Sequence, residues 1–264
     1  MTSFLKPKIR RPNEPLNSLG LARADYEGNM STLCAGCGHD SVTAAIVKTF
    51  YELGIPPHRA LKISGIGCSS KTTTYFMKDS HGANTVHGRM PSFATGALSA
   101  NNDLACIGIS GDGDSLSIGL GQMAHAMRRN VNMLYVLENN GVYGLTKGQF
   151  SATSDSGSKS KKGVVNTDQP IDLVSVAISL GASFVARSFS GDKKQLVPLI
   201  RAAMSHSGAA LIDVISPCVA FNNHDGSSKS YDYVREHNES VNRLDFMPNR
   251  EPISANQEPG TSMP

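Results

Sequence analysis

The stretch Leu104-Ala-Cys-Ile-Gly-Ile-Ser-Gly-Asp-Gly-Asp-Ser115 decides the fold that we expect for this chain of 264 residues. Its first six residues are almost wholly apolar, and such a run before a glycine-rich turn is typical of a buried strand. A helical pattern over Leu116–Met127 follows, and then a second apolar run over Val131–Leu137. A strand, a helix and another strand in this order predict two parallel neighbours in one sheet.

The same alternation extends along most of the chain. We expect strands at 60–66, 104–109, 131–137, 183–186 and 209–215, and helices at 44–51, 91–100, 116–127, 171–180 and 194–205. Because helices that connect parallel strands cover both faces of a sheet, the predicted fold is α/β, with a parallel β-sheet between two helical layers. The predicted organisation is an N-terminal arm (1–30), one domain (31–225) with a Ser- and Gly-rich loop (150–168), and a polar C-terminal tail (226–264).

The composition is typical of a soluble globular protein, with 39% hydrophobic and 18% charged residues. A net charge of +3 is too small to indicate a nucleic-acid partner. No apolar stretch approaches the roughly 20 residues that span a membrane, and the N-terminus lacks the apolar core of a secretion signal. We therefore expect a cytoplasmic protein, whose five cysteines are metal ligands, catalytic groups or buried thiols rather than disulfides.

Polar residues follow the two central strands at the point where each strand ends. Asp112 stands between Gly111 and Gly113, and Asn139-Asn140 follows the next strand. Ligands of open α/β sheets bind at the carboxyl ends of the strands, where glycines and a new helix N-terminus can approach a phosphate. A carboxylate is a hard oxygen ligand that suits Mg²⁺ shared with phosphate oxygens. Neighbouring parallel strands would place Asn140 beside Asp112.

A single Gly-Asp-Gly could be no more than a turn, but its distance from the paired asparagines is informative. Between Gly113 and Asn139 lie 25 residues, which is enough for one helix and one strand. This arrangement resembles the signature of thiamine diphosphate enzymes. The resemblance implies that Asp112, the side chain of Asn140 and the carbonyl of Val142 bind Mg²⁺.

Four of the five cysteines fall in loops or at predicted strand ends. Cys34 and Cys37 form a C-x2-C pair in a Gly-rich loop, and Cys68 and Cys218 each follow a strand, whereas Cys106 lies inside an apolar run and is expected to be a small buried residue. Four thiolates can hold either zinc or a [4Fe–4S] cluster. Structural zinc sites usually have two close pairs, so the dispersed spacing favours a cluster over zinc or unconnected thiols.

Six segments resemble the β subunit of 2-oxoacid:ferredoxin oxidoreductases, in the order of that family and between about residues 30 and 225. They are Cys34-Ala-Gly-Cys-Gly-His39, Gly65-Ile-Gly-Cys-Ser-Ser-Lys71, His87-Gly-Arg-Met-Pro91, Gly111-Asp-Gly-Asp114, Asn139-Asn-Gly-Val-Tyr-Gly-Leu-Thr-Lys-Gly-Gln149 and Pro217-Cys218. The resemblance implies that Cys34, Cys37, Cys68 and Cys218 bind one [4Fe–4S] cluster. It also implies oxidative decarboxylation of a 2-oxoacid with coenzyme A to acyl-CoA and CO₂, with ferredoxin as electron acceptor.

The resemblance also assigns further residues to the site. Those expected to contact thiamine diphosphate are Ile66, Gly67, Cys68, Ser69, His87, Gly111, Gly113, Asp114, Gly144, Leu145 and Thr146. His87 is expected near the reacting centre as a polar or acid–base group. Lys71 and Lys147 are, with His87, the expected catalytic residues. The two lysines are either solvated or turned inward, where they would meet a distal carboxylate and so favour 2-oxoglutarate over pyruvate. The stretch Gly144–Gly148 also looks more like that of members that accept 2-oxoglutarate or mixed oxoacids than like that of pyruvate-specific members.

Thiamine diphosphate enzymes need a second domain that grips the aminopyrimidine ring, and this chain has room for the diphosphate-binding half only. We therefore expect an α subunit that carries the other half, an α2β2 assembly, and no activity of this chain alone. Three alternatives stay open. They are a β subunit specific for pyruvate, branched-chain oxoacids or indolepyruvate, a non-oxidative thiamine diphosphate decarboxylase or synthase subunit, and a metal-binding structural module without catalysis.

Overall fold

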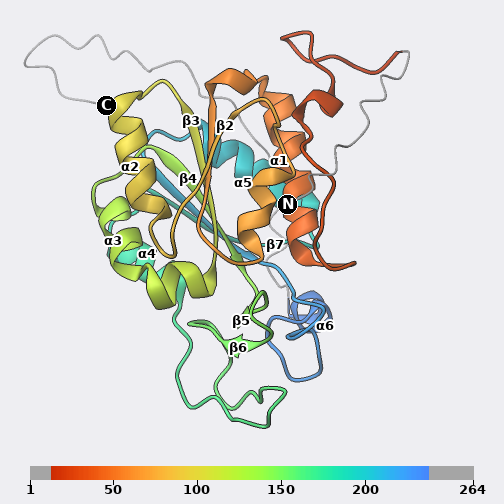
Figure 1. The fold of residues 1–264 in the computed structure, drawn as a ribbon, viewed down its shortest axis with the longest axis vertical. Coiled ribbons are helices and arrows are strands. Elements are labelled where there is room, and N and C mark those ends of the chain that lie inside the picture. The colour runs from red at the N-terminus through yellow and green to blue at the C-terminus, as the bar shows by residue number, and fades with distance from the viewer. Residues whose placement is uncertain (1–12, 238–264) are drawn as a thin grey trace, which may run out of the picture.

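The computed structural model describes residues 13–237 and has a six-stranded sheet at its centre (Figure 1). The strands lie in the order β2 (His81–Asn84), β1 (Ala60–Ser64), β3 (Ala105–Gly111), β4 (Met133–Asn139), β8 (Ala209–Ile215) and β7 (Phe184–Phe189). Every neighbouring pair is parallel. The predicted parallel sheet is therefore confirmed, and the carboxyl ends of all its strands meet at one edge.

Helices cover both faces of the sheet, as expected (Figure 1). One face carries α1 (Gly38–Leu53) and α5 (Lys193–Ser205), and the other carries α2 (Met90–Ala100), α3 (Leu120–Arg128) and α4 (Leu173–Ser179). Beyond the carboxyl edge lie the small hairpin of β5 (Val142–Tyr143) and β6 (Gln149–Phe150) and the short helix α6 (Tyr231–Glu236). Single turns of 3₁₀ helix occupy η1 (Arg23–Tyr26), η2 (Pro57–Arg59) and η3 (Ser69–Thr74), and a π-helical turn, η4, occupies Gly113–Ile118.

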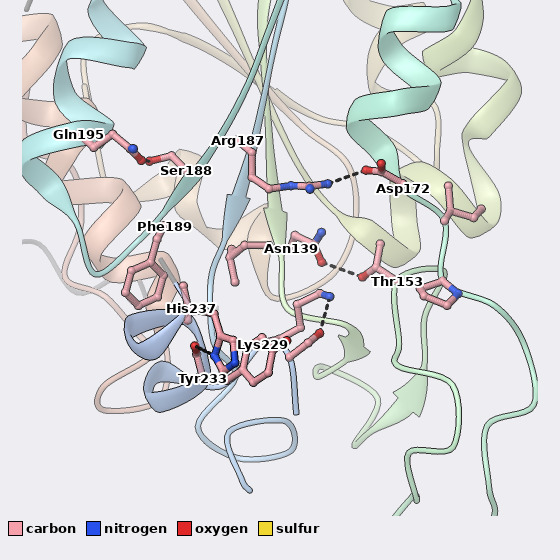
Figure 2. A pocket seen from close by; sticks show the side chains of 15 residues that line it. Asn139, Thr153, Asp172, Arg187, Ser188, Phe189, Gln195, Lys229, Tyr233 and His237 are labelled. Carbon is pink, nitrogen blue, oxygen red and sulfur yellow. Dashed lines mark hydrogen bonds and ion pairs between the residues drawn. The ribbon is translucent and has the colours of Figure 1, made fainter. Parts of the chain in front are cut away.

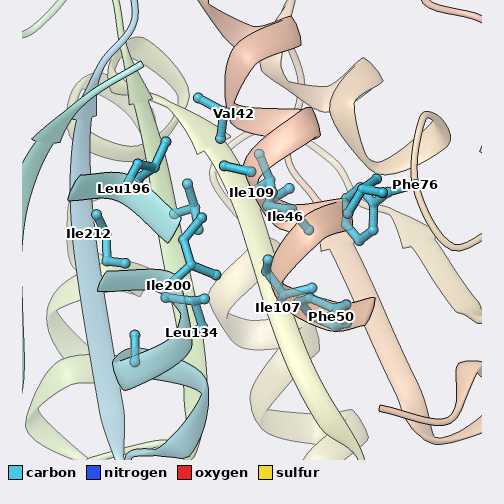
Figure 3. Close-up of a cluster of buried hydrophobic side chains, with 14 of the residues drawn as sticks. Val42, Ile46, Phe50, Phe76, Ile107, Ile109, Leu134, Leu196, Ile200 and Ile212 are labelled. Carbon is cyan, nitrogen blue, oxygen red and sulfur yellow. The ribbon is translucent and has the colours of Figure 1, made fainter. Parts of the chain in front are cut away.

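The core consists of two apolar clusters because alternate residues of each strand point to opposite faces. On β3, Ile107 and Ile109 face α1 and α5, while Cys106 belongs to the cluster under α2, α3 and α4. Figure 3 shows the first cluster, in which Ile46 of α1 and Ile200 of α5 pack beside these strand residues. The prediction that Cys106 is a small buried residue is confirmed, since it is 3% exposed.

Two helices differ most from the expected boundaries. Helix α1 begins at Gly38 rather than at residue 44, and its first turns escaped prediction because they are polar and carry no apolar periodicity. It ends at Leu53, and the next residue, Gly54, has a φ of 60°, which suits glycine. The helix expected over 116–127 is divided into η4 and α3 at Gly119. The Gly119 amide donates to the Asp114 carbonyl, five residues back, which is the bond of a π turn.

The described part of the expected arm, residues 13–30, packs against α1. Tyr26 is fully buried, and its hydroxyl accepts a hydrogen bond of 2.9 Å from Asn17 Nδ2. The described part of the expected tail includes α6, whose Tyr231 hydroxyl donates to the carbonyl of Gly36 at 3.0 Å. The boundaries at 30 and 225 stay predictions, and residues 1–12 and 238–264 lie outside the described chain. Among the described helices, none has the length and apolar character of a membrane span.

Candidate functional site

A cavity of about 110 Å³ lies at the carboxyl edge of the sheet, where β1, β3 and β4 end. Its wall is formed by His39, Ile66, Gly67, Cys68, Ser69, His87, Gly111, Asp112, Gly113, Asp114, Asn140, Val142, Tyr143, Gly144, Leu145 and Thr146. Every residue that the sequence assigned to thiamine diphosphate or to Mg²⁺ is in this wall. The structure thus brings these residues together, while their individual roles stay predictions.

Asp112 and Asn140 meet because β3 and β4 are parallel neighbours with Gly111 opposite Glu138. Asp112 is 1% exposed, and its Oδ2 accepts hydrogen bonds from the hydroxyls of Thr153, at 2.6 Å, and Ser151. Burial raises the pKa of Asp112, and these hydroxyls oppose that rise. The carboxylate is therefore fixed in direction by two residues that follow the β5–β6 hairpin.

A chain of polar contacts continues from Thr153 into the sheet. Its Oγ1 lies 2.7 Å from Asn139 Oδ1, and Asn139 Nδ2 donates to Asp213 Oδ1 at 3.0 Å. Asp213 is fully buried and accepts a bond of 2.9 Å from Arg187 Nε, while Arg187 also pairs with Asp172. Figure 2 shows Asn139 and Thr153 in the wall of a second, larger cavity of about 640 Å³. The orientation of Asp112 thus depends on a network that crosses three strands.

His87 is held by Asp114, the second residue of the π-helical turn η4. Asp114 Oδ1 accepts from His87 Nδ1 and from the Gly88 amide, both at 2.9 Å, and its Oδ2 accepts from Ser110 Oγ at 2.6 Å. Both carboxylate oxygens are thus occupied by protein donors. With Nδ1 bonded to Asp114, the other ring nitrogen of the half-exposed His87 is the one available for chemistry in the cavity.

The loop with Cys34 and Cys37 packs against the chain beyond β8. The Gly38 amide donates to the Pro217 carbonyl at 3.2 Å, and a Cβ on Gly38 would lie 2.7 Å from the carbonyl carbon of Ser216. This close approach requires glycine at position 38. It places the first two cysteines next to the segment that carries Cys218.

Cys68 and Cys218 both face Gly144, in the turn between β5 and β6. A Cβ on Gly144 would lie 3.4 Å from the sulfur of Cys68 and 3.5 Å from that of Cys218. Burial raises the pKa of Cys68 and that of Cys37, the latter to about 12, and Cys218 adds to the rise of both. Within residues 13–237, no three His, Cys, Asp or Glu side chains converge on a single metal-ion position. The thiols are therefore neighbours, but they do not meet at one point.

A buried pair of ionisable residues, absent from the predicted site, lies behind the cysteines. His39 Nδ1 is 2.6 Å from Ser216 Oγ and 3.5 Å from Glu138 Oε2, and Thr72 Oγ1 lies 3.0 Å from each oxygen of Glu138. Burial raises the pKa of Glu138 well above its usual value and lowers that of His39 to about 4. In both cases burial favours the neutral form of the side chain. A carboxyl within an apolar strand was the available sequence signal for Glu138.

The two lysines that were considered as catalytic residues are not in the cavity wall. Lys71 lies in η3 near Cys68, whose pKa it lowers slightly against the larger effect of burial. Lys147 is exposed and has a φ of 77° in the β5–β6 turn. Their contact with a substrate carboxylate stays a prediction. Ser151 and Thr153 were missed, because they fall in a stretch whose composition indicates only a loop.

Comparisons with known proteins agree with this site. Residues 65–214 match the family described as "Thiamine pyrophosphate enzyme, C-terminal TPP binding domain", where thiamine pyrophosphate is another name for thiamine diphosphate. A "2-oxoacid:ferredoxin oxidoreductase subunit beta" from a Sulfolobus species is 41% identical over 221 residues, which cover 83% of this chain and 70% of that protein. The 2-oxoglutarate oxidoreductase β-type subunit of Mycobacterium tuberculosis is 42% identical over 74% of this chain and 51% of its own length.

A solved structure is similar as well. It is a 2-oxoglutarate:ferredoxin oxidoreductase from Magnetococcus marinus with 2-oxoglutarate, coenzyme A and succinyl-CoA bound, with a TM-score of 0.77 and 38% identity. The match covers 82% of this chain and 73% of that one. The chain therefore belongs to the family of 2-oxoacid:ferredoxin oxidoreductase β subunits, in which it carries the thiamine diphosphate-binding domain.

Proposed function

We propose that this chain binds thiamine diphosphate through Mg²⁺, carries one [4Fe–4S] cluster, and acts with an α subunit on a 2-oxoacid, with 2-oxoglutarate preferred. The reaction is oxidative decarboxylation with coenzyme A to acyl-CoA and CO₂, and the electrons pass through the cluster to ferredoxin in the cytoplasm. The observation that carries the proposal is the single cavity that contains all residues predicted to bind thiamine diphosphate and Mg²⁺, with the predicted cluster ligand Cys68 in its wall.

The oxygen atoms available at the ends of β3 and β4 fit Mg²⁺. Asp112 offers a buried carboxylate oriented by two hydroxyls, and Asn140 Oδ1 already accepts a bond of 3.1 Å from the Val142 amide, which fixes its direction. Carboxylate, amide and carbonyl oxygens are the hard ligands that this ion selects, with phosphate oxygens completing the shell. Asp112, Asn140 and the carbonyl of Val142 would hold the ion.

The thiols fit a cluster better than a single zinc ion. A [4Fe–4S] cluster takes one thiolate at each of four corners, so its ligands must surround a volume. Cys68 and Cys218 both face Gly144, and the loop of Cys34 and Cys37 packs on the segment that carries Cys218. Since burial raises the pKa of Cys37 and Cys68, binding of the cluster would release protons.

Thiamine diphosphate supplies the carbon centre that makes decarboxylation possible, and the protein supplies position and electrostatics. Gly113 allows close packing, since a Cβ there would overlap the Tyr143 ring, and the Tyr143 hydroxyl donates to the Gly113 carbonyl at 3.0 Å. Asp114 holds His87 at the cavity, where its free ring nitrogen can move a proton. His39 in the cavity wall and Glu138 behind it are both buried, and burial favours the neutral form of each side chain.

The cavity is small for a whole cofactor, because ligand pockets typically measure about 300 Å³ or more, whereas this one measures about 110 Å³. A partner chain would complete it. The relatives are named β subunits, which implies an α partner, and we propose an α2β2 assembly. The 2-oxoglutarate in the similar structure and in the names of relatives favours that substrate over pyruvate, branched-chain oxoacids and indolepyruvate.

The test uses the αβ complex purified without oxygen. Expected results are about four irons and four sulfides per β subunit, magnesium-dependent binding of thiamine diphosphate by calorimetry, and reduction of a one-electron dye with 2-oxoglutarate and coenzyme A. Asp112→Ala should abolish the binding, and the control Asp103→Ala, at an exposed surface aspartate, should preserve it. Stoichiometric zinc without iron would overturn the cluster. Cofactor binding without dye reduction would favour a non-oxidative enzyme, and no cofactor binding would favour a structural module.

A further inference from the structure

Exposed apolar side chains gather where α2 and α3 lie side by side (Figure 1). Large apolar side chains are buried in most soluble domains, so a group of exposed ones indicates an interaction surface. Val86 is 72% exposed, Phe93 47% and Ile118 45%. We define the apolar patch as Val86, Phe93, Gly96, Ile118, Leu120 and Gly121.

Two contacts show that the members of the patch are neighbours. A Cβ on Gly88 would lie 2.7 Å from Gly119 Cα, which brings the segment after Val86 against the one that contains Ile118 and Leu120. Ser92 Oγ donates to Gln122 Oε1, which ties the start of α2 to α3 beside Phe93. The two helices thus present one surface.

Two exposed glycines make this surface unusual. Gly96 lies in the interior of α2 and Gly121 in the first turn of α3, and a Cβ on either would have no neighbour within 4 Å. Glycine in the middle of a helix costs about 1 kcal/mol relative to alanine. No neighbour within residues 13–237 requires it at position 96. A bare stretch of helix backbone does allow another chain to approach closely.

The patch is continuous with the rim of the cofactor cavity. His87 lines the cavity and lies between Val86 and Gly88 in the chain, and η4 runs from the cavity residue Gly113 to Ile118. Helix α2 has no charged residue from Met90 to Ala100. A partner that closes the cavity would therefore also reach this patch, where α2 carries no charge and the charged Arg89 stands just before the helix.

We propose that the apolar patch binds an apolar helix face of the α subunit, with Gly96 at the point of closest approach and Phe93 beside it. The inference rests on the proposed function in so far as that function requires an α partner to complete the cavity. The α subunit is the expected partner because the patch is continuous with the cavity that this subunit would complete.

The test measures the dissociation constant of the αβ complex by sedimentation of the co-expressed subunits. Phe93→Asp should raise it at least tenfold, because a carboxylate would be desolvated at the contact. Gly96→Gln should also raise the dissociation constant, because the longer side chain blocks close approach. Glutamine is a better helix former than glycine, so the isolated variant should melt no lower than the wild type. Ile178→Asp, at a side chain on α4 that is 61% exposed, is the matched control and should bind as the wild type.

Wild-type affinity of both patch variants would overturn the proposal, and so would the absence of any complex. If the patch variants disrupt only self-association of this chain, the partner is a second copy and the proposal is wrong. Binding is measured without cofactor or turnover, so an αβ complex that lacks iron or activity would refute the proposed function and leave the patch result standing.

Discussion

Replacement of Thr153 by valine should weaken magnesium binding without touching a metal ligand. The hydroxyl of Thr153 donates to Asp112 Oδ2 at 2.6 Å and lies 2.7 Å from Asn139 Oδ1, and the side chain is only 2% exposed. Valine keeps the shape and removes the proton donor. A hydrogen bond to a charged group contributes roughly 1.5–3 kcal/mol. Because Ser151 still donates to the same oxygen, we expect the lower value.

A loss of about 1.5 kcal/mol corresponds to a dissociation constant for Mg²⁺ that is roughly tenfold higher. The effect should be larger at pH 6 than at pH 8. Burial already raises the pKa of Asp112, and removal of a donor raises it further, so that less of the carboxylate is ionised at the lower pH. Calorimetric titration of the αβ complex with Mg²⁺ at saturating thiamine diphosphate measures both quantities.

Two controls separate this effect from a general loss of stability. Thr153→Ser keeps the hydroxyl and should restore most of the affinity. Thr49→Val removes an equally buried hydroxyl, bonded to the Ala45 carbonyl in α1, and should leave magnesium affinity unchanged. Equal affinity of Thr153→Val and wild type at both pH values would refute the reasoning.

Three further predictions concern stability and assembly. Burial lowers the pKa of Lys62 from 10.5 to about 8, so the folded state holds this proton less tightly than the unfolded chain does. The free energy of unfolding should therefore rise by about 3 kcal/mol between pH 8 and pH 10.5. Urea unfolding of Lys62→Met should lack that rise, and the same pH dependence in the variant and the wild type would contradict the prediction. Gly65→Ala should cost about 1–3 kcal/mol in the same assay, because its Cβ would overlap Asp114 Oδ2, whereas Gly96→Ala, in open space, should not destabilise. The isolated chain should show no turnover until the α subunit is added, and dye reduction by the chain alone would refute this.

The central strands could be predicted from the sequence because each is an apolar run between polar or glycine-rich turns. The strand expected at 209–215 is β8 to the residue, and β4 is displaced by two residues from the expected 131–137. The parallel order of β3 and β4 then places Asp112 beside Asn140 without further information. Edge strand β2 escaped prediction because three of its four residues are exposed and none has strong β propensity.

The partners of Asp112 could not be predicted in the same way. Ser151 and Thr153 contact it across 39 and 41 residues, and no local pattern records a pairing over that distance. The same holds for Cys68 and Cys218, which lie together only because β1 and β8 end at the same edge of the sheet. Spacing indicated that the cysteines form a group, but only the fold shows that two of them face Gly144.

The β5–β6 hairpin joins the two inorganic centres proposed for this protein. Its turn places Gly144 against Cys68 and Cys218, and the chain that leaves it places Ser151 against Asp112. Only two residue pairs, Val142 with Phe150 and Tyr143 with Gln149, set its register. An insertion or deletion of one residue in this turn would shift both centres together, so the length of residues 144–148 is a shared constraint. Variation in length among related chains should therefore avoid this turn and accumulate elsewhere.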